Sequence, residues 1–225
     1  MDKKLKAVLI AVLVIVLGGA GFLGYEYVTQ KLTANDGIEM LSKGEYQKAY
    51  EAFEKAGGKK TILWTNQKND VMFYQAESLY RLKRYKDAIR IYDRIIEKKP
   101  QGRAYEWKAL CYMGLGQEEQ ALEVCSEGIR SLPSEGESYY AKYSILAKQE
   151  KYDEGLSVVG EALKQNLTTK KKDLMFARIS LYEAKFDFKT AYRYAKEYVK
   201  AYPDDEKGKK EATFLETRYM IFKAA

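Results

Sequence analysis

The stretch RYKDAIRIYDRIIEKKP, from Arg84 to Pro100, carries an aromatic residue, an alanine three positions later, a second aromatic four positions after that, and a closing proline. Similar stretches occur at four other places along the chain. The small residue of each copy recurs about every 35 positions, at Ala49, Ala88, Ala121, Gly155 and Ala191. A period of this length predicts a row of stacked units rather than one compact core.

The composition favours a helical protein without metal or cofactor chemistry. The 225 residues include 3 prolines and 16 glycines, which are few turn-forming residues for a protein built of strands and hairpins. Histidine is absent, which removes the commonest general base and a frequent metal ligand. Two cysteines are too few for a four-ligand zinc site. We therefore expect no catalytic residues, no metal and no cofactor. Pairs of Asp and Glu residues are too common on the helices of such a stack to identify an enzyme site.

The N-terminal segment is predicted to belong to a membrane. After three lysines, the chain has no charged residue from Ala7 to Tyr25, and a helix of this length rises about 28 Å, close to the thickness of a bilayer core. We expect a membrane anchor over residues 1–30, with a transmembrane helix at about 7–25. The small residues from Gly18 to Gly21 leave a cleaved, secreted form open as an alternative.

The charges beside this segment predict its orientation, and its small residues allow pairing. Lysines cluster on the N-terminal side, while the other flank opens with Tyr25 and Glu26, so the N-terminus is expected in the cytoplasm and the repeats outside it, in a single-pass cell-membrane protein. Ala20 and Gly24 lie four positions apart, a spacing that permits close helix packing. A homodimer through the anchor is thus one expectation, and contact with lipid alone is the other.

The repeats resemble the tetratricopeptide repeat, a helix-turn-helix unit of 34 residues. The second copy places Ala76, Leu79, Tyr85 and Tyr92 at signature positions around the shared alanine. The prolines Pro100, Pro133 and Pro203 all fall at the same repeat position. Two copies depart from the pattern, with Tyr143 and Ile179 where small residues are expected.

The resemblance implies an all-α fold, a right-handed superhelix of helix-turn-helix repeats that follows one transmembrane helix. About five repeats would occupy residues 31–203. A capping helix would close the open end over residues 204–225, where apolar Ala212, Leu215, Tyr219 and Phe222 recur at helical spacing. A tail helix that docks to a partner would use the same face.

The resemblance also implies a partner-binding groove, because the first helices of such repeats line a concave surface. By repeat position, the groove would contain Phe73, Glu77, Tyr80, Arg81, Glu106, Met113, Tyr140, Lys148 and Phe176. This mixture of aromatic, aliphatic and charged side chains suits a protein or peptide segment better than a phosphate backbone. The family's clamp for a C-terminal carboxylate has no counterpart at these positions. Solvated surface without a partner is the competing interpretation.

Two further features have plain explanations in the sequence. Lysines gather at residues 170–172 and at Lys207, Lys209 and Lys210, but the formal net charge is only +7 and no nucleic-acid motif accompanies them. We therefore expect solvated faces there and no nucleic-acid partner, with contact to an anionic membrane or cell-wall polymer as the alternative. Cys111 and Cys125 lie in one repeat and are expected either as buried free thiols or as a disulfide.

The function predicted from these observations is that of a non-catalytic, membrane-anchored scaffold. It would bind a protein or peptide through the concave face of its repeats, in envelope assembly or secretion. Two alternatives remain open: a docking module that faces the cytoplasm, and a glycan- or cell-wall-binding module in which Tyr80 and Tyr140 stack on sugars.

Overall fold

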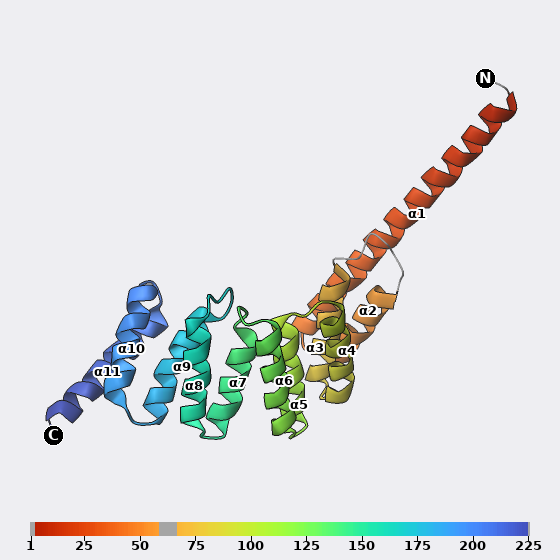
Figure 1. Cartoon of the computed structure of the whole chain (residues 1–225). Coiled ribbons are helices and arrows are strands. Elements are labelled where there is room, and N and C mark those ends of the chain that lie inside the picture. The colour runs from red at the N-terminus through yellow and green to blue at the C-terminus, as the bar shows by residue number, and fades with distance from the viewer. Residues whose placement is uncertain (1–2, 59–66, 225) are drawn as a thin grey trace. The chain divides into compact units, whose positions relative to one another are not determined.

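The computed structural model describes the backbone of residues 3–58 and 67–224, and the side chains of residues 16–58 and 70–221. Every regular element in these ranges is an α-helix, and they contain no strand (Figure 1). In chain order the helices are α1 (Lys3–Ser42), α2 (Tyr46–Gly58), α3 (Gln67–Arg81), α4 (Tyr85–Lys98), α5 (Gly102–Gly114), α6 (Glu118–Ser131), α7 (Glu137–Lys148), α8 (Tyr152–Lys164), α9 (Lys171–Ala184), α10 (Phe188–Ala201) and α11 (Glu206–Ala224). The predicted all-α class is confirmed.

The helices end where the prolines predict. Helices α4, α6 and α10 each finish two residues before Pro100, Pro133 and Pro203. A proline ring clashes with the preceding turn and offers no backbone N–H, so the helix cannot continue through it. The prolines therefore mark the end of a helix pair at three of the repeats.

The chain divides into two compact units, residues 1–95 and 96–225. In the first unit, the C-terminal part of α1 packs against α2, and α2 packs against α3. Phe53 of α2 is fully buried at the centre, and its ring stacks on Tyr74 of α3 with centroids 5.5 Å apart. Gly37 of α1 is required beside it, because a Cβ there would lie 2.8 Å from the Phe53 ring. Helix α1 is thus fixed to the unit by its last turns.

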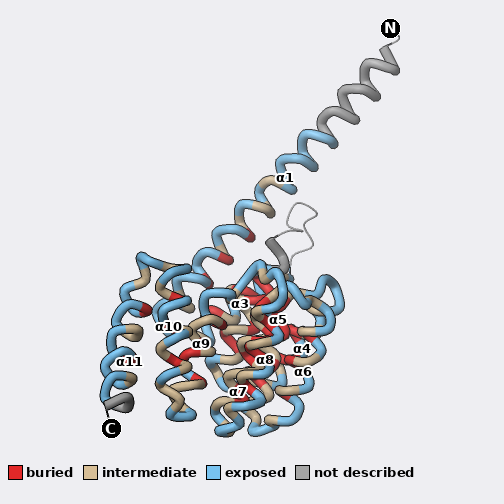
Figure 2. The backbone as a smooth tube through the Cα atoms, turned by 60° about the vertical axis from the view of Figure 1, so that its left-hand side comes forward, coloured by how far each residue is buried: buried red, intermediate tan, exposed pale blue. Residues whose placement is uncertain are grey.

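The second unit stacks three helix pairs, α5–α6, α7–α8 and α9–α10, and adds α11. Its apolar core runs from pair to pair, as the buried positions in Figure 2 show. Small residues at the repeat's shared positions, including Ala109 and Ala121, are fully buried. Leu122 packs against two successive core clusters. The small residues let the helices approach closely, as the repeat pattern predicts.

The two departures from the pattern are accommodated differently. Ile179 is fully buried and packs with Ala191 and Ala195 of α10. Tyr143 is half-buried, and its ring meets the Tyr140 ring edge-on at a centroid distance of 5.1 Å. A larger side chain at these positions therefore fills space between helices instead of preventing the stack.

A three-residue turn joins the two helices of every pair, and its middle residue is left-handed each time. The middle residues and their φ angles are Gly44 (77°), Lys83 (59°), Gly116 (73°), Glu150 (59°) and Phe186 (59°). The same pair of backbone hydrogen bonds closes each turn; in the first, Gly44 N–H donates to the Leu41 carbonyl and Glu45 N–H to that of Met40. This is the Schellman arrangement, which favours glycine at the left-handed position. Three turns adopt it with a larger side chain.

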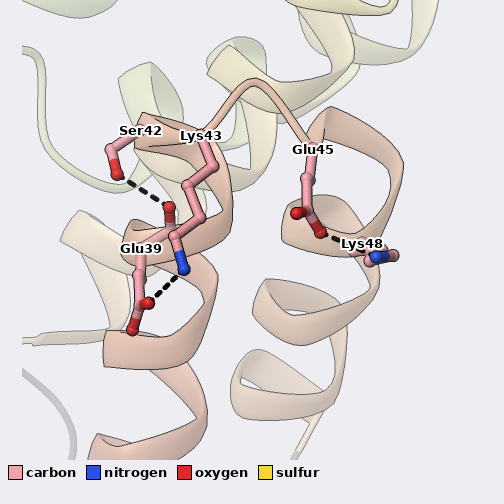
Figure 3. A network of polar contacts seen from close by, with 5 residues as sticks. All are labelled: Glu39, Ser42, Lys43, Glu45 and Lys48. Carbon is pink, nitrogen blue, oxygen red and sulfur yellow. Dashed lines mark hydrogen bonds and ion pairs between the residues drawn. The ribbon is translucent and has the colours of Figure 1, made fainter.

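Ion pairs flank the first of these turns (Figure 3). Lys43 contacts the Glu39 carboxylate at 2.5 Å, and Lys48 contacts Glu45 at 2.7 Å on the other side of the bend. The Ser42 hydroxyl donates to the Glu39 carbonyl. All of these groups are exposed, so solvent screens each pair and the pairs contribute little to stability.

Helix α11 lies on α10 at the end of the second unit. Leu215 is fully buried with Tyr198 and Ile179, and half-buried Ala212 packs against the same cluster. Tyr219 stacks on Tyr192 of α10 at 5.8 Å. Phe222 lies outside the residues with described side chains. Helix α11 starts two residues after the predicted boundary, and its role as a cap stays a prediction.

Helix α1 continues without a break through the glycines of the predicted anchor. Where side chains are described, from Val16 onward in this helix, no segment is both long and apolar enough to cross a membrane. Residues 7–15 of the predicted transmembrane helix lie outside that part.

Both cysteines are free and buried. Burial raises the pKa of the Cys111 thiol to about 12, and the pKa of the Cys125 thiol likewise to about 12. They are protonated at neutral pH and fill core space, so the free-thiol alternative holds in this structure.

Candidate partner-binding groove

Four of the predicted groove residues lie on α3 in the first unit. Glu77 and Arg81 form an ion pair at 3.4 Å, one helical turn apart. Tyr80 is half-buried and meets the Tyr85 ring edge-on, with centroids 5.5 Å apart. Glu77, Tyr80 and Arg81 therefore share one side of α3, and their contact with a partner stays a prediction.

Phe73 differs from these three. Its side chain is only 4% exposed, and its ring packs 6.0 Å from that of Tyr92 on α4. A side chain this deeply packed contributes to folding and offers almost no surface to a partner. Sequence position could not show this, because the residues at the same repeat position in other copies, Glu106, Tyr140 and Phe176, are only half-buried.

Three predicted residues of the second unit come close together. Glu106 on α5, Tyr140 on α7 and Phe176 on α9 belong to the first helices of successive repeats, and α7 contacts both α5 and α9. Tyr140 and Phe176 line one hollow of about 410 Å³, and Glu106 lines another of about 420 Å³. Lys170 joins the two, since it lines the second hollow and its Nζ lies 4.9 Å from the Tyr140 ring centroid. We call this surface the α5–α7–α9 groove.

The other two predicted residues of this unit do not line either hollow. Met113 is half-buried and packs against the core cluster around Tyr105. Lys148 is exposed in the last turn of α7. Their participation in binding is untested by this geometry.

Three lysines that the sequence did not assign to the groove also line it or contact its residues. Lys172 contacts Asp205 at 2.6 Å, and the Lys207 ammonium lies 4.1 Å from the Phe176 ring centroid. Lys170 is half-buried and lies 3.9 Å from the Glu106 carboxylate. Lys172 and Lys207 are exposed, as the prediction of solvated faces expects, whereas Lys170 is half-buried, and all three contact groups of the groove. The missing signal is tertiary: Lys207 belongs to α11, and only folding brings it over a ring on α9.

Asp205 organises the end of the groove next to α11. Its carboxylate accepts hydrogen bonds from Lys172, from the Tyr198 hydroxyl at 2.6 Å and from the Gly208 backbone N–H at 3.2 Å. The Lys172 hydrogen bond first, and then the other two, hold the pKa of Asp205 well below its usual range. Burial, followed by the bond to Asp205, raises the pKa of Tyr198. The acid is therefore a fixed anion at neutral pH, and Lys172 is held in place.

Burial is the main cause of the pKa shifts of two other groups in the groove. Burial raises the pKa of Glu106, with Lys170 acting in the opposite direction, and it raises the pKa of Tyr143 to about 12. Tyr143 and Tyr198 are therefore neutral hydrogen-bonding groups at physiological pH. No cluster of three or more potential metal-ligating side chains occurs among the described residues. The aromatic rings of the groove can stack on a ligand, its hydroxyls can form hydrogen bonds, and its charged side chains can neutralise charges of the ligand.

Two protein-family models match the chain. A tetratricopeptide-repeat model covers residues 41–103, and the model of the anaphase-promoting complex (cyclosome) subunit 3 covers residues 83–162. Together with the structural neighbours, these matches support the tetratricopeptide repeat family.

Solved structures of low sequence identity share the fold. TTC0263, a thermophilic TPR protein in Thermus thermophilus, has a TM-score of 0.58 at 16% identity over 84% of this chain and 99% of its own. A tetratricopeptide repeat protein from Parabacteroides merdae gives 0.56 at 15% identity, over 84% of this chain and 73% of its own. MamA from Desulfovibrio magneticus gives 0.53 at 18% identity, over 79% and 97%. At this identity the likeness shows the fold alone.

Proposed function

Since the chain is an all-α stack of tetratricopeptide-type repeats, which generally serve as non-catalytic scaffolds, we propose that it is a membrane-tethered scaffold. In this proposal the α5–α7–α9 groove binds an extended or helical peptide segment of a partner protein. The tether is the apolar N-terminal part of α1, and the setting is envelope assembly or secretion.

The observation that carries the binding role is the pairing of aromatic faces with cations in the groove. Lys170 lies over Tyr140 and Lys207 over Phe176, and Lys207 lines the same hollow as both rings. Adjacent packed helices lie 8–10 Å apart as a rule, so the groove extends about 20 Å across three helices. About six residues of an extended peptide would fill this length.

Charge balance in the groove favours a peptide over a nucleic acid. Lys170 and Lys172 each contact a carboxylate of the protein itself. A phosphate backbone would have to displace these carboxylates, whereas a peptide with both signs can exchange contacts with them. The exposed Ser180 lines the same hollow as the rings of Tyr140 and Phe176. Its small side chain leaves space for a peptide and its hydroxyl can form a hydrogen bond with it.

The tether rests on the exposure of α1. Val16, Leu17 and Phe22 are 58%, 63% and 64% exposed, and the sequence has no charged residue from Ala7 to Tyr25. A continuous helix that shows large apolar side chains to its surroundings is stable in a bilayer core, where all of its backbone groups are paired internally. Alkaline extraction of membranes tests this part: the full chain is expected to stay in the pellet, and its release would discard the tether.

The orientation follows from the lysines before Ala7. We propose a cytoplasmic N-terminus and extracytoplasmic repeats. Added protease should degrade the repeats in spheroplasts while a cytoplasmic control protein stays intact. Protection of the repeats until the membrane is opened would instead favour the cytoplasm-facing docking module.

The groove is tested by site-specific photo-crosslinking with the full chain in membranes. A photoreactive amino acid at position 180 is expected to capture a defined partner, whereas the same group at Phe186 captures none of it. Phe186 is a matched control because it is 79% exposed on a turn and does not line the groove.

Two variants then separate binding from folding. Tyr140→Ala combined with Phe176→Ala should lower capture about tenfold or more, which corresponds to one lost ring contact or two. Ser180→Arg should lower capture by filling the hollow without removing a packed side chain, so its helicity and melting temperature should match the parent. Undiminished capture in Ser180→Arg would overturn the groove assignment.

A further inference from the structure

Helix α1 carries an exposed apolar stripe that nothing in the first unit covers. The stripe runs through Gly18, Gly21, Tyr25, Val28 and Leu32. Tyr25, Val28 and Leu32 are 68%, 54% and 58% exposed, and a Cβ at either glycine would have no neighbour within 4 Å. Figure 2 shows this part of α1 mostly exposed.

The stripe lies opposite the face by which α1 is attached. From Val16 onward, where the side chains of α1 are described, the buried residues are Gln30, Ala34 and Gly37. At 100° per residue they lie on the other side of the helix from Val28 and Leu32. A second helix can therefore approach the stripe without displacing α2.

The spacing of the stripe alternates between three and four residues. This is the a/d pattern of helices that pack side by side at a small crossing angle, here with position a at residues 18, 25 and 32 and position d at 21 and 28. We call these five residues the α1 seam. The seam ends at Leu32, because the next d position, Asn35, lines a hollow against α3.

Charged residues on both edges of the seam fit a parallel partner. Lys31 occupies position g and Asp36 the following position e, and both are exposed, although the Lys31 side chain also lines the hollow against α3. In a parallel, in-register pair, a g residue meets the e residue five positions later on the other helix. Lys31 of each copy would then face Asp36 of the other, which gives two symmetric attractive pairs.

Lipid alone does not account for the whole seam. Leu32 lies seven residues beyond Tyr25, which places it about 10 Å past the end of the uncharged segment, and Glu26 and Lys31 are charged. The last turns of the seam would thus meet water unless a protein surface covers them. The glycines continue the seam into the uncharged segment, where small residues let two helices approach closely.

We propose that α1 pairs with α1 of a second copy of this chain, parallel and in register, along the α1 seam. The seam is short for a coiled coil in water, so the proposed tether contributes by confining both copies to one surface in one orientation. Pairing through Ala20 and Gly24, the alternative suggested by their spacing alone, would use a different side of the helix.

Disulfide crosslinking of the full chain in membranes tests the seam. Leu32→Cys and Val28→Cys, which sit on the symmetry axis of the proposed pair, should form disulfide dimers rapidly with copper phenanthroline. Leu23→Cys is the matched control, since Leu23 is 37% exposed on the opposite side of α1. The native Cys111 and Cys125 are buried and should not interfere. Equal rates at positions 32 and 23 would overturn the proposal.

A charge exchange tests the register independently. In the Leu32→Cys background, Lys31→Glu should weaken the dimer about five- to thirtyfold, because two attractions become two repulsions. Adding Asp36→Lys to the same chain should restore it, while Asp36→Lys alone should weaken it. Failure of the double variant to recover would reject the parallel register. The membrane-pelleting result separates this outcome from a failure of the tether.

Discussion

Leu17 in α1 is 63% exposed, whereas Leu215 in α11 is fully buried, although both are leucines in a helix at one end of the chain. The glycines of the two helices differ in the same way. A Cβ at Gly18 would meet nothing within 4 Å, but at Gly208 it would lie 2.6 Å from Cδ1 of Tyr198. The N-terminal helix therefore leaves its apolar face open, whereas the C-terminal helix buries its own against α10.

This difference between α1 and α11 shows that the type of a residue does not determine whether it packs in the core or stays exposed. In α11, Leu215 and Gly208 are fixed by the shape of α10 beneath them. In α1, the corresponding residues are compatible with lipid or with another helix, because the first unit packs only against the other side. Stability measurements should separate these two roles.

The largest expected effect is the loss of Leu215. Leu215→Ala should lower the free energy of unfolding by about 3 kcal/mol, the usual cost of a cavity in a packed core. Leu17→Ala should change it by less than about 0.5 kcal/mol. Urea unfolding of the full chain in detergent, followed by circular dichroism, measures both. Equal losses would mean that α1 is packed as tightly as α11.

Gly208 gives the next largest effect. Gly208→Ala should lower the free energy of unfolding by about 2 kcal/mol, because the added methyl overlaps the Tyr198 ring. Gly18→Ala should be neutral or slightly raise helicity, since alanine is the better helix former and has open space there. A neutral Gly208→Ala would show that Tyr198 moves aside freely.

A carboxylate pair makes the C-terminal end sensitive to pH. Burial, and then the neighbouring Glu211 of α11, raises the pKa of Glu183 to about 7. The folded protein thus holds a proton that the unfolded chain releases above about pH 4.5, so the free energy of unfolding falls as the pH rises from about 4.5 to about 7.

The variant Glu183→Gln isolates this effect. It should be more stable than the parent at pH 8 by about 1 kcal/mol and should show little advantage at pH 4.5. Glu39→Gln in α1 is the control, as that side chain is exposed. Melting curves at the two pH values measure the difference, and an equal gain at both would argue against titration of Glu183.

The smallest effects are expected in the turns that join the two helices of a pair. Gly44 after α1 and Phe186 before α10 share the left-handed conformation. Phe186→Gly should stabilise the protein by about 0.5–1 kcal/mol, and Gly44→Ala should destabilise it by about 1 kcal/mol. Thermal unfolding measures both, and a loss of stability in Phe186→Gly would indicate a packing role for that ring.

The groove could be predicted from the sequence only in part. Repeat spacing brought Glu106, Tyr140 and Phe176 to one surface, because the first helices of successive repeats lie side by side. It could not show that Phe73 turns into the core. It also gave no sign that Lys207, from the last helix, would lie over Phe176.

The sequence by itself determined the helical class, the pairing of the helices and their ends. Small residues at a fixed period allow close contact, and a proline prevents the preceding helix from continuing through it, so both act through local geometry. The tertiary structure alone decided which side chains remain open and which charges meet. These depend on contacts between residues far apart in the chain, such as Lys172 with Asp205, and no local rule encodes them.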